Sequence, residues 1–375
     1  MTIPVMKPLL GAEEAAAAAE AVASGWVAQG PRVARFEREF AARVGAGHGV
    51  AVSSCTAGLH LALVLHGIGP GDEVVVPSLS FIATANAVRY TGATPIFADV
   101  EAQTGNLTAK TVEAVLTSAT RAVMVVHQAG VPADIDELRA LCDPLGLPLL
   151  EDAACAVGST YRGRPVGAAS VVAAWSFHPR KLLTTGEGGM LTVEDEAAAI
   201  RLRRLREHGM DVSAADRHTA RGPVVESYLE TGFNYRMTDI QAAVGLVQLS
   251  RLEEIVGRRR ELAASYHAML ADIPGLHTAR DPGYGTTNYQ SFWVLLPDDF
   301  PVSRNRVLEL MHEADISPRR GIMATHLQPA YEGHPHGDLP VTEQITAQSM
   351  ILPLFHDMTK TEQERVVAVL IEAAA

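Results

Sequence analysis

Cysteine is scarce in this chain of 375 residues, which has only Cys55, Cys142 and Cys155. Their spacing matches no metal-binding motif, and three cysteines form no even disulfide framework. No apolar stretch approaches the roughly 20 residues that a membrane-spanning helix needs. The first residues show no continuous apolar run after a basic start, so we expect no secretory signal. Together these absences predict a cytoplasmic protein with reduced thiols, no metal site and no membrane partner.

Positive charge is also in deficit. Lysine and arginine number 31 against 43 aspartates and glutamates, which gives a formal net charge of −12. A charge of this sign argues against nucleic acid as the main partner. We interpret the densest basic run, at residues 258–260, as the solvated face of a helix. The chain is 47% hydrophobic and 20% charged, which at this length predicts a globular protein with one large and one smaller domain.

Lysine itself is rare, because only residues 7, 110, 181 and 360 are lysines. Lys181 lies in "SFHPRKLLTTGEGG", between an apolar run and a glycine-rich turn. Arginine can replace a lysine that supplies only charge, but it cannot replace an amine that must lose its proton. Burial and the neighbouring Arg180 would lower the pKa of such a lysine and favour a Schiff base. A surface lysine is the alternative, and only the other motifs decide between the two.

The apolar runs predict an α/β fold. Short β-branched runs alternate with helix-length amphipathic segments as far as about residue 190, which is typical of a mostly parallel sheet. No long helix separates the runs at 171–177 and 189–193, so the sheet admits an antiparallel strand there. The earlier runs lie at 48–54, 72–78, 94–100, 121–127 and 147–152.

The pattern changes twice along the rest of the chain. Helical periodicity dominates at 194–209 and again at 237–270. From about residue 285 an apolar run and two further helices indicate a small α+β unit. We therefore predict a large α/β domain over residues 1–250 and a small C-terminal domain over residues 251–375.

Polar residues follow two of the predicted strands, at the edge where open α/β sheets bind ligands. Ser53, Ser54 and Thr56 form a turn between a strand and a helix, which can bind an anion. Glu151 and Asp152 end an apolar strand, where a carboxylate can hold a positive charge such as a protonated pyridine nitrogen. The simpler alternatives are that Thr56 and Asp152 only cap the segments that follow them.

These motifs occur together in an order that resembles a known family. The chain is similar to the DegT/DnrJ/EryC1/StrS family of sugar aminotransferases, which depend on pyridoxal phosphate (PLP). The resemblance spans nearly the whole chain and implies a fold-type I transferase whose large domain binds PLP. The motifs that carry it are "SSCTAGLHLAL", "VVPSLSFIATANAV", "PIFADVE", "EDAACAVGS", "SFHPRKLLTTGEGG", "GFNYRMTDIQAAVGLVQL" and "HLQPAY".

The resemblance implies a role for each matching position. Lys181 would form the Schiff base with the cofactor, and Asp152 would pair with its pyridine nitrogen. Phe81 would stack on the ring, and Asn234 would reach the phosphate of the other subunit in a homodimer with shared active sites. The residues implied for the phosphate in the same subunit are Thr56, the backbone of Ala57, and Ser176.

Three further residues are candidates near the reacting groups. His326 of "HLQPAY" would lie near the substrate, and His178 would contact the substrate or pack beside the cofactor. Cys155 departs from the family pattern, because many relatives have glutamine or histidine there, near the cofactor's phenolic oxygen. A thiol is smaller and a weaker hydrogen-bond donor, which puts the substrate geometry near Cys155 in doubt.

The resemblance implies transfer of an amino group, from glutamate, to the C4 ketone of a nucleotide-linked 4-keto-6-deoxy sugar. "SFHPRK" with "TTGEGG" resembles the C4 branch more than the C3 branch, which tends to show a tyrosine and "GDGG". A C3-keto sugar or an inosose-type cyclitol ketone is the alternative substrate. A related dehydratase would have histidine in place of Lys181, and a non-catalytic PLP-binding regulator would not need the intact set of Asp152, Ser176 and Lys181.

Overall fold

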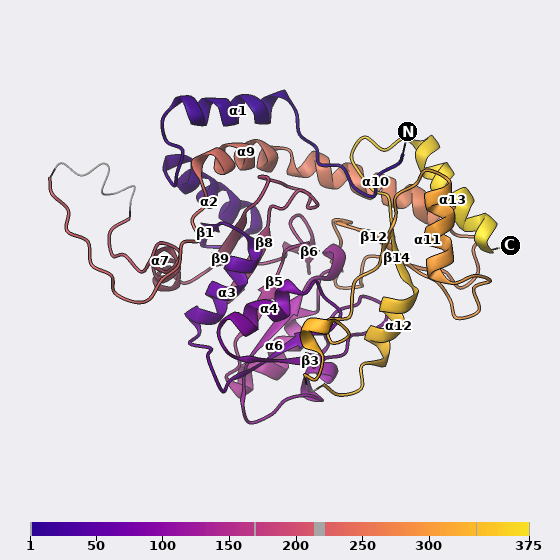
Figure 1. Ribbon diagram of the computed structural model, residues 1–375, viewed down its shortest axis with the longest axis horizontal. Coiled ribbons are helices and arrows are strands. Elements are labelled where there is room, and N and C mark those ends of the chain that lie inside the picture. The colour runs from indigo at the N-terminus through magenta and orange to yellow at the C-terminus, as the bar shows by residue number, and fades with distance from the viewer. Residues whose placement is uncertain (1, 169, 214–221, 335, 375) are drawn as a thin grey trace.

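A computed structural model of the protein describes residues 2–168, 170–213, 222–334 and 336–374 (Figure 1). Its α-helices are α1 Ala12–Ala23, α2 Pro31–Val44, α3 Cys55–Leu65, α4 Ala83–Tyr90, α5 Ala109–Glu113, α6 Ile135–Cys142, α7 Glu196–Leu205, α9 Asp239–Ser250, α10 Leu252–Met269, α11 Arg304–Glu313, α12 Pro340–Gln348 and α13 Lys360–Ala374. Its strands are β1 His48–Val52, β2 Glu73–Pro77, β3 Thr94–Ala98, β4 Thr120–Val126, β5 Leu149–Asp152, β6 Thr160–Tyr161, β7 Arg164–Pro165, β8 Val172–Ser176, β9 Gly189–Val193, β10 His277–Thr278, β11 Gly285–Thr286, β12 Phe292–Leu295, β13 Arg319–Arg320 and β14 Ser349–Leu352.

Within the described residues, a seven-stranded sheet has the order β1-β9-β8-β5-β4-β2-β3. Strand β9 is antiparallel to both of its neighbours, and the other paired strands run parallel. The predicted α/β fold with a mostly parallel sheet is thus confirmed, and so is the antiparallel strand where the helix is missing. Consecutive parallel strands must be joined by crossovers, and the helices of these crossovers cover the sheet.

Alternate residues of each strand enter different cores, as the two-residue period of a strand requires. In β2, Val74 and Val76 pack in the core under α3, α4 and α7, whereas Val75 packs in the core under α5 and α6. In β8, Ala174 joins the first of these cores, and Trp175 joins a third core with α2 and α9. Both faces of the sheet are therefore buried, which explains why its strands are continuous apolar runs.

The C-terminal part of the chain has its own sheet and core. Strands β10, β12, β14 and β13 pair antiparallel in that order, and α11 and α13 pack beside them (Figure 1). Ile3 belongs to this core too, so the N-terminus returns to the C-terminal part. Helix α10 joins two cores, because Leu252 packs with the large sheet and Leu262 with the small one. The boundary predicted at residue 250 stays a prediction.

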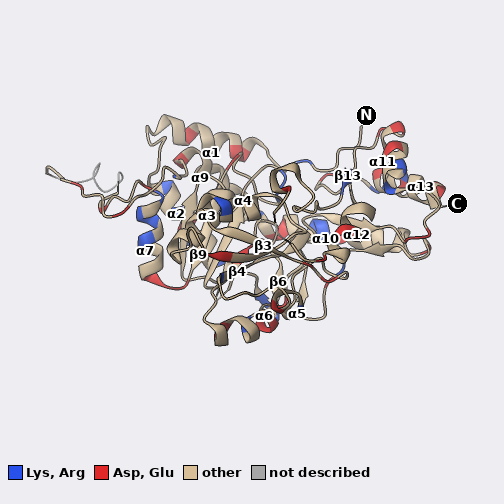
Figure 2. Cartoon of the chain, turned by 60° about the horizontal axis from the view of Figure 1, so that its bottom comes forward, with Lys and Arg blue, Asp and Glu red and all other residues tan. Residues whose placement is uncertain are grey.

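The basic residues of helices α7 and α10 lie in different surroundings. Figure 2 shows basic residues along α7, and two of them, Arg201 and Arg204, pair with Glu230. The basic run in α10 is not a fully solvated face, because Arg259 is only 3% exposed. Its guanidinium donates hydrogen bonds to the carbonyls of Tyr289, Gln290 and Leu354 at 2.7, 2.8 and 3.1 Å. The prediction was therefore wrong for Arg259, and burial lowers its pKa to about 10.

Among the described helices, none combines the length and the apolar character needed to cross a bilayer. The described residues also contain no cluster of three or more metal-ligating side chains. All three cysteines are free thiols.

Candidate active site

The carboxylate of Asp152 ends β5 on the face toward α3 and α4. Leu150 lies two residues earlier on the same face, in the core under these helices. Asp152 is 5% exposed and accepts hydrogen bonds from Thr84 Oγ1 at 2.9 Å and from the Ala154 N–H at 3.2 Å. Burial raises its pKa, although these donors and the positive charge of Lys181 oppose the rise. The carboxylate does accept from the backbone of the segment that follows it, as the simpler alternative predicts. It is also a buried acidic group that can form an ion pair with a cation.

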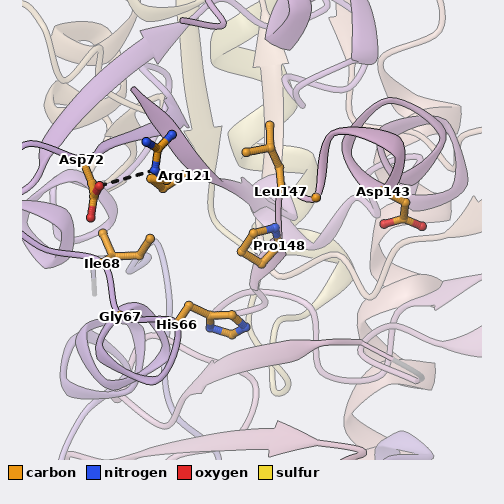
Figure 3. Close-up of a pocket in the computed structure, with 9 residues that line it drawn as sticks. His66, Gly67, Ile68, Asp72, Arg121, Asp143, Leu147 and Pro148 are labelled. Atoms are coloured by element: carbon orange, nitrogen blue, oxygen red, sulfur yellow. Dashed lines mark ion pairs between the residues drawn. The ribbon is translucent and has the colours of Figure 1, made fainter. Parts of the chain in front are cut away.

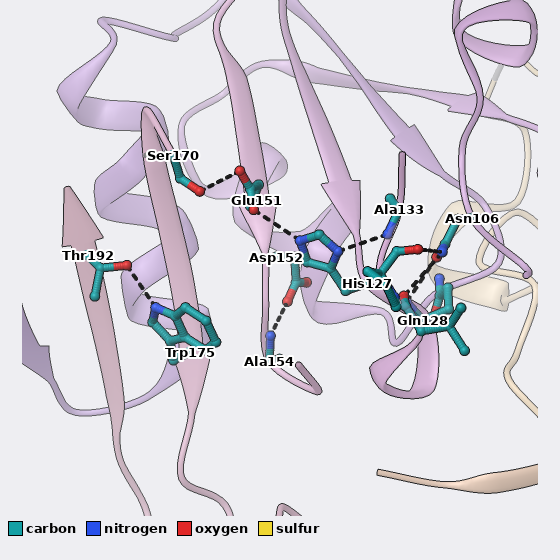
Figure 4. A network of polar contacts seen from close by, with 12 residues as sticks. Asn106, His127, Gln128, Ala133, Glu151, Asp152, Ala154, Ser170, Trp175 and Thr192 are labelled. Atoms are coloured by element: carbon teal, nitrogen blue, oxygen red, sulfur yellow. Dashed lines mark hydrogen bonds and ion pairs between the residues drawn. The ribbon is translucent and has the colours of Figure 1, made fainter. Parts of the chain in front are cut away.

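A second polar network holds the opposite face of the same strand (Figure 4). Glu151 Oε2 lies 3.1 Å from His127 Nε2, and the Ser170 hydroxyl donates to the other carboxylate oxygen. The Ala133 N–H donates to His127 Nδ1 at 3.1 Å, so that nitrogen carries no proton. His127 therefore donates from Nε2 to Glu151 as a neutral imidazole. This network fixes the end of β5, and therefore the backbone that carries Asp152.

The start of α3 lies beside this edge of the sheet. Ser54 caps the helix, because its Oγ accepts from the Ala57 N–H at 3.1 Å and its carbonyl accepts from Gly58. Thr56 is therefore a first-turn residue and not the cap. The Ala57 N–H is already engaged by Ser54, which leaves the N–H groups of Cys55 and Thr56 for an anion. Gly189 of β9 explains part of the glycine-rich turn, because a Cβ there would lie 2.6 Å from the Cys55 nitrogen.

Lys181 follows β8, the parallel neighbour of β5, so its loop lies at the same edge as Asp152. Its Nζ lies 3.0 Å from Cys155 Sγ and donates to it. Burial lowers the pKa of Lys181, but Cys155, Cys55 and Asp152 raise it, and the net shift is upward. The prediction of a lowered pKa for Lys181 is therefore wrong, although burial acts in the predicted direction. Arg180 is exposed, and the acidic neighbours outweigh burial.

The other predicted residues are distributed around this edge. Ser176 ends β8, and its Oγ accepts from the His178 N–H at 3.4 Å. Phe81 is 66% exposed in the turn before α4. Asn234 is also exposed, on a segment held against β1 because the Ser53 N–H donates to the Tyr235 carbonyl at 2.7 Å. The structure thus leaves Phe81 and Asn234 accessible.

His326 is held within the chain. Its Nδ1 lies 2.6 Å from Ser78 Oγ, and its Nε2 lies 3.2 Å from Glu343 Oε1. Both ring nitrogens are engaged, so contact with a substrate would require one of these bonds to break. His178 is more accessible, with its side chain 43% exposed, although its Nδ1 accepts from the Arg180 N–H at 3.2 Å.

Sequence reasoning missed several residues at this edge. Two of them are polar residues next to the end of a strand, which is the signal that identified Asp152. Thr84 lies in the first turn of α4, and His127 directly follows β4. Asn288 and Gln290 gave no such signal. They come from the segment before β12 and contact the loops after β5 and β8 from more than 100 residues away.

A cavity of about 630 Å³ opens at the opposite edge of the sheet, near the amino ends of β2, β4 and β5 (Figure 3). Among its lining residues, Arg121 lies 3.7 Å from Asp72 and also donates to two backbone carbonyls. No lysine lines it, and none of the predicted site residues does. The cavity therefore lacks the residues of the predicted site, and the carboxyl edge of the sheet carries them.

The groups at the carboxyl edge fit PLP. A buried carboxylate suits a cationic ring nitrogen, an amine suits an aldehyde, and a helix N-terminus flanked by hydroxyls suits a phosphate. Asp152, Lys181 and the first turn of α3 supply these three elements. The donor set of the described residues thus matches the ring nitrogen, the aldehyde and the phosphate of the cofactor.

Comparisons with known proteins identify the family and the fold. The sequence model of the DegT/DnrJ/EryC1/StrS aminotransferase family matches residues 8–371. DesV of S. venezuelae, solved in complex with a ketimine intermediate, is 38% identical, with 96% of this chain and 94% of that chain covered and a TM-score of 0.88. DesI, solved in the presence of its TDP-sugar product, is 33% identical, with coverage of 98% and 91% and a TM-score of 0.89. Spr1654 of Streptococcus pneumoniae, a putative sugar aminotransferase in its PMP form, is 25% identical, with coverage of 99% and 99% and a TM-score of 0.92.

Proposed function

The chain belongs to the DegT/DnrJ/EryC1/StrS aminotransferase family, and from that premise we propose that it aminates the C4 ketone of a nucleotide-linked 4-keto-6-deoxy sugar, with glutamate as amino donor. It is a sugar aminotransferase that depends on PLP, and neighbouring structures have been solved in the PLP and PMP forms. One observation carries the assignment of its site. The Lys181 amine, which lies 3.0 Å from Cys155 Sγ, follows β8, and the buried Asp152 ends its parallel neighbour β5, at the carboxyl edge of the sheet.

Bound PLP supplies an electron sink for the negative charge that develops on the substrate carbon when it loses a proton. Asp152 would hold a proton at the ring nitrogen, because its ionised oxygens, buried with only two donors, favour a cation. Lys181 would carry the covalent link to the cofactor. Once free, its Nζ would take a proton from the substrate carbon and deliver a proton to the cofactor carbon, and it would do the reverse in the second half of the reaction.

The raised pKa of Lys181 adds a condition to this mechanism. Without the cofactor, the acidic neighbours favour the ammonium form of Lys181, so its amine must lose a proton before it can link to the cofactor. Its nearest group is the Cys155 thiol, where many relatives have glutamine or histidine. Cys155 would therefore lie beside the reacting nitrogen, and we assign it to the cofactor site.

The phosphate would bind at the first turn of α3. Thr56 and Ser176 would supply hydroxyl donors, and the free N–H groups of the turn would add backbone donors. Because the Ala57 N–H is engaged by Ser54, its predicted phosphate contact requires that bond to be shared or to yield. Phe81 would stack on the ring, and its exposed side chain is available for this contact.

We further propose a homodimer in which each site is completed by the partner. Asn234 is exposed on a segment next to the start of α3, from where it would reach the partner's phosphate site. The stretch before it exposes large apolar side chains, with Val225 at 88% and Tyr228 at 62%. These side chains are available for contact with a partner subunit, where their burial would remove apolar surface from water.

The substrate class is supported by DesI, which was solved in the presence of a TDP-sugar. The C4 position is supported by the sequence around Lys181, and a C3-keto sugar or cyclitol ketone is the alternative. The test is to incubate the purified protein with glutamate and a panel of 4-keto sugars, 3-keto sugars and inosose, and to measure aminated product. We expect the highest kcat/KM with a nucleotide-linked 4-keto sugar. A higher value for inosose or a 3-keto sugar would contradict the C4 assignment.

A further inference from the structure

A short segment before β12 carries buried polar side chains that no role in binding the substrate or cofactor explains. Asn288 is fully buried and Gln290 is only 7% exposed. Tyr289, between them, has a φ of 50°, a left-handed conformation that costs a bulky residue about 1 kcal/mol or more. Such a conformation persists only where the surroundings fix it. The hydrogen bonds of this segment show what fixes it.

Asn288 connects this segment to the loop after β5. Its Nδ2 donates to the carbonyls of Cys155 and Val157, both at 2.8 Å. Its Oδ1 accepts from the Gln290 N–H at 2.8 Å, so every hydrogen-bonding group of the side chain has a partner. A Cβ on Gly130 would lie 1.9 Å from the same Oδ1, and Gly130 has a φ of 94°. Only glycine allows the backbone to approach the amide this closely.

Gln290 connects the segment to the loop after β8. Its Nε2 donates to the Arg180 carbonyl at 2.6 Å, one residue before Lys181. The two amides thus hold the backbones on both sides of one contact, the 3.0 Å contact between Lys181 Nζ and Cys155 Sγ. Arg259 of α10 fixes the segment in turn, because its guanidinium donates to the carbonyls of Tyr289 and Gln290.

We propose that Asn288 and Gln290 are positioning residues that hold the Lys181 amine in place for its link to the cofactor. This inference rests on the proposed role of Lys181. The two amides touch neither the amine nor the thiol, and they act through the backbone of Arg180 and Cys155. Through these bonds, the C-terminal part of the chain helps to hold the loop that carries Lys181.

Position matters here because a reacting group must be held within about 0.5 Å of its productive place. Lysine has four rotatable side-chain bonds, so its amine can be held only if its backbone is fixed first. The loop after β8 is not part of a helix or strand at Lys181, and the Lys181 N–H makes a local turn bond to the His178 carbonyl at 2.8 Å. The Gln290 bond adds a restraint from outside the loop.

The test is Gln290→Met, which keeps the length of the side chain and removes its donor. The matched control is Gln363→Met, because Gln363 is a buried glutamine of the same C-terminal part, donates one bond to the Leu262 carbonyl at 2.9 Å, and contacts no site residue. A second test variant is Asn288→Asp, which keeps the acceptor for Gln290 and loses both donor bonds. PLP is titrated into each protein, and its dissociation constant and the circular dichroism of the bound cofactor are measured.

We expect Gln290→Met and Asn288→Asp to raise the dissociation constant of PLP about tenfold, the scale of one lost hydrogen bond. We also expect them to weaken the circular dichroism of the cofactor band, which depends on how rigidly the ring is held. Gln363→Met should lower the melting temperature and leave both quantities unchanged. Wild-type values in both test variants, or equal losses in the control, would overturn the inference. A wild-type protein with no borohydride-sensitive band would instead overturn the proposed role of Lys181.

Discussion

Replacing Lys181 by arginine separates a chemical role of this residue from a structural one. Nζ makes a single hydrogen bond, to Cys155 at 3.0 Å, and interacts with the charge of Asp152. A guanidinium keeps the positive charge and can donate to the same thiol. If Lys181 served only the fold, Lys181→Arg should therefore cost less than about 1 kcal/mol of stability and retain most activity.

The chemical role predicts a very different result. At pH 7.5 about one lysine side chain in 10³ is a neutral amine at its ordinary pKa, against about one arginine in 10⁵ or fewer. A guanidinium also forms no stable link to the cofactor aldehyde. We therefore expect Lys181→Arg to lose at least about 10⁴-fold in kcat, as much as Lys181→Ala.

The assay follows 2-oxoglutarate formed from glutamate under steady-state conditions, with melting temperatures measured in parallel to show that each variant folds. A folded Lys181→Arg protein that retains more than about one hundredth of wild-type turnover would refute the reasoning, since catalysis would then proceed without the amine.

Three further predictions follow from the same contacts. Asp152→Asn should still bind PLP but lose most transamination, because an amide does not stabilise a protonated ring nitrogen; turnover close to wild type would make Asp152 only a cap for Ala154. Mixed dimers of Lys181→Ala and Asn234→Ala chains should regain activity through hybrid sites, and mixed dimers no more active than their parents would contradict shared sites. Arg259→Met should cost about 2–4 kcal/mol by leaving three buried carbonyls without donors. Arg306→Met, which removes exposed ion pairs, should cost far less in the same denaturant titrations, and equal losses would contradict the role of Arg259.

The sequence predicted the parts of this structure that depend on local pattern. Alternating apolar runs and helices imply the parallel sheet, and the missing helix before Gly189 implies the antiparallel β9. The end of the apolar run placed Asp152 at the carboxyl edge, because parallel strands all end at the same edge of a sheet. Strand and helix periodicity is a property of neighbouring residues, so it can be read from one sequence.

The parts that escaped prediction depend on contacts between distant segments. Arg259 looked like one residue of a solvated basic run, and nothing near it in sequence indicates the carbonyls that surround it. The contact of Lys181 with Cys155 and the bond from Gln290 to Arg180 join loops that only the folded chain brings together. The upward shift in the pKa of Lys181 has the same origin, because the acidic neighbours that cause it are not its neighbours in sequence.

The central claim is that Lys181 carries the cofactor, and this chain allows a direct test because it contains only four lysines. The protein is loaded with PLP, reduced with borohydride, digested and mapped by mass spectrometry. We predict that the yellow absorbance is bleached and that the reduced cofactor is found on the peptide containing Lys181. A reduced adduct on Lys7, Lys110 or Lys360 in place of Lys181, or no adduct in a protein that binds PLP, would contradict the account.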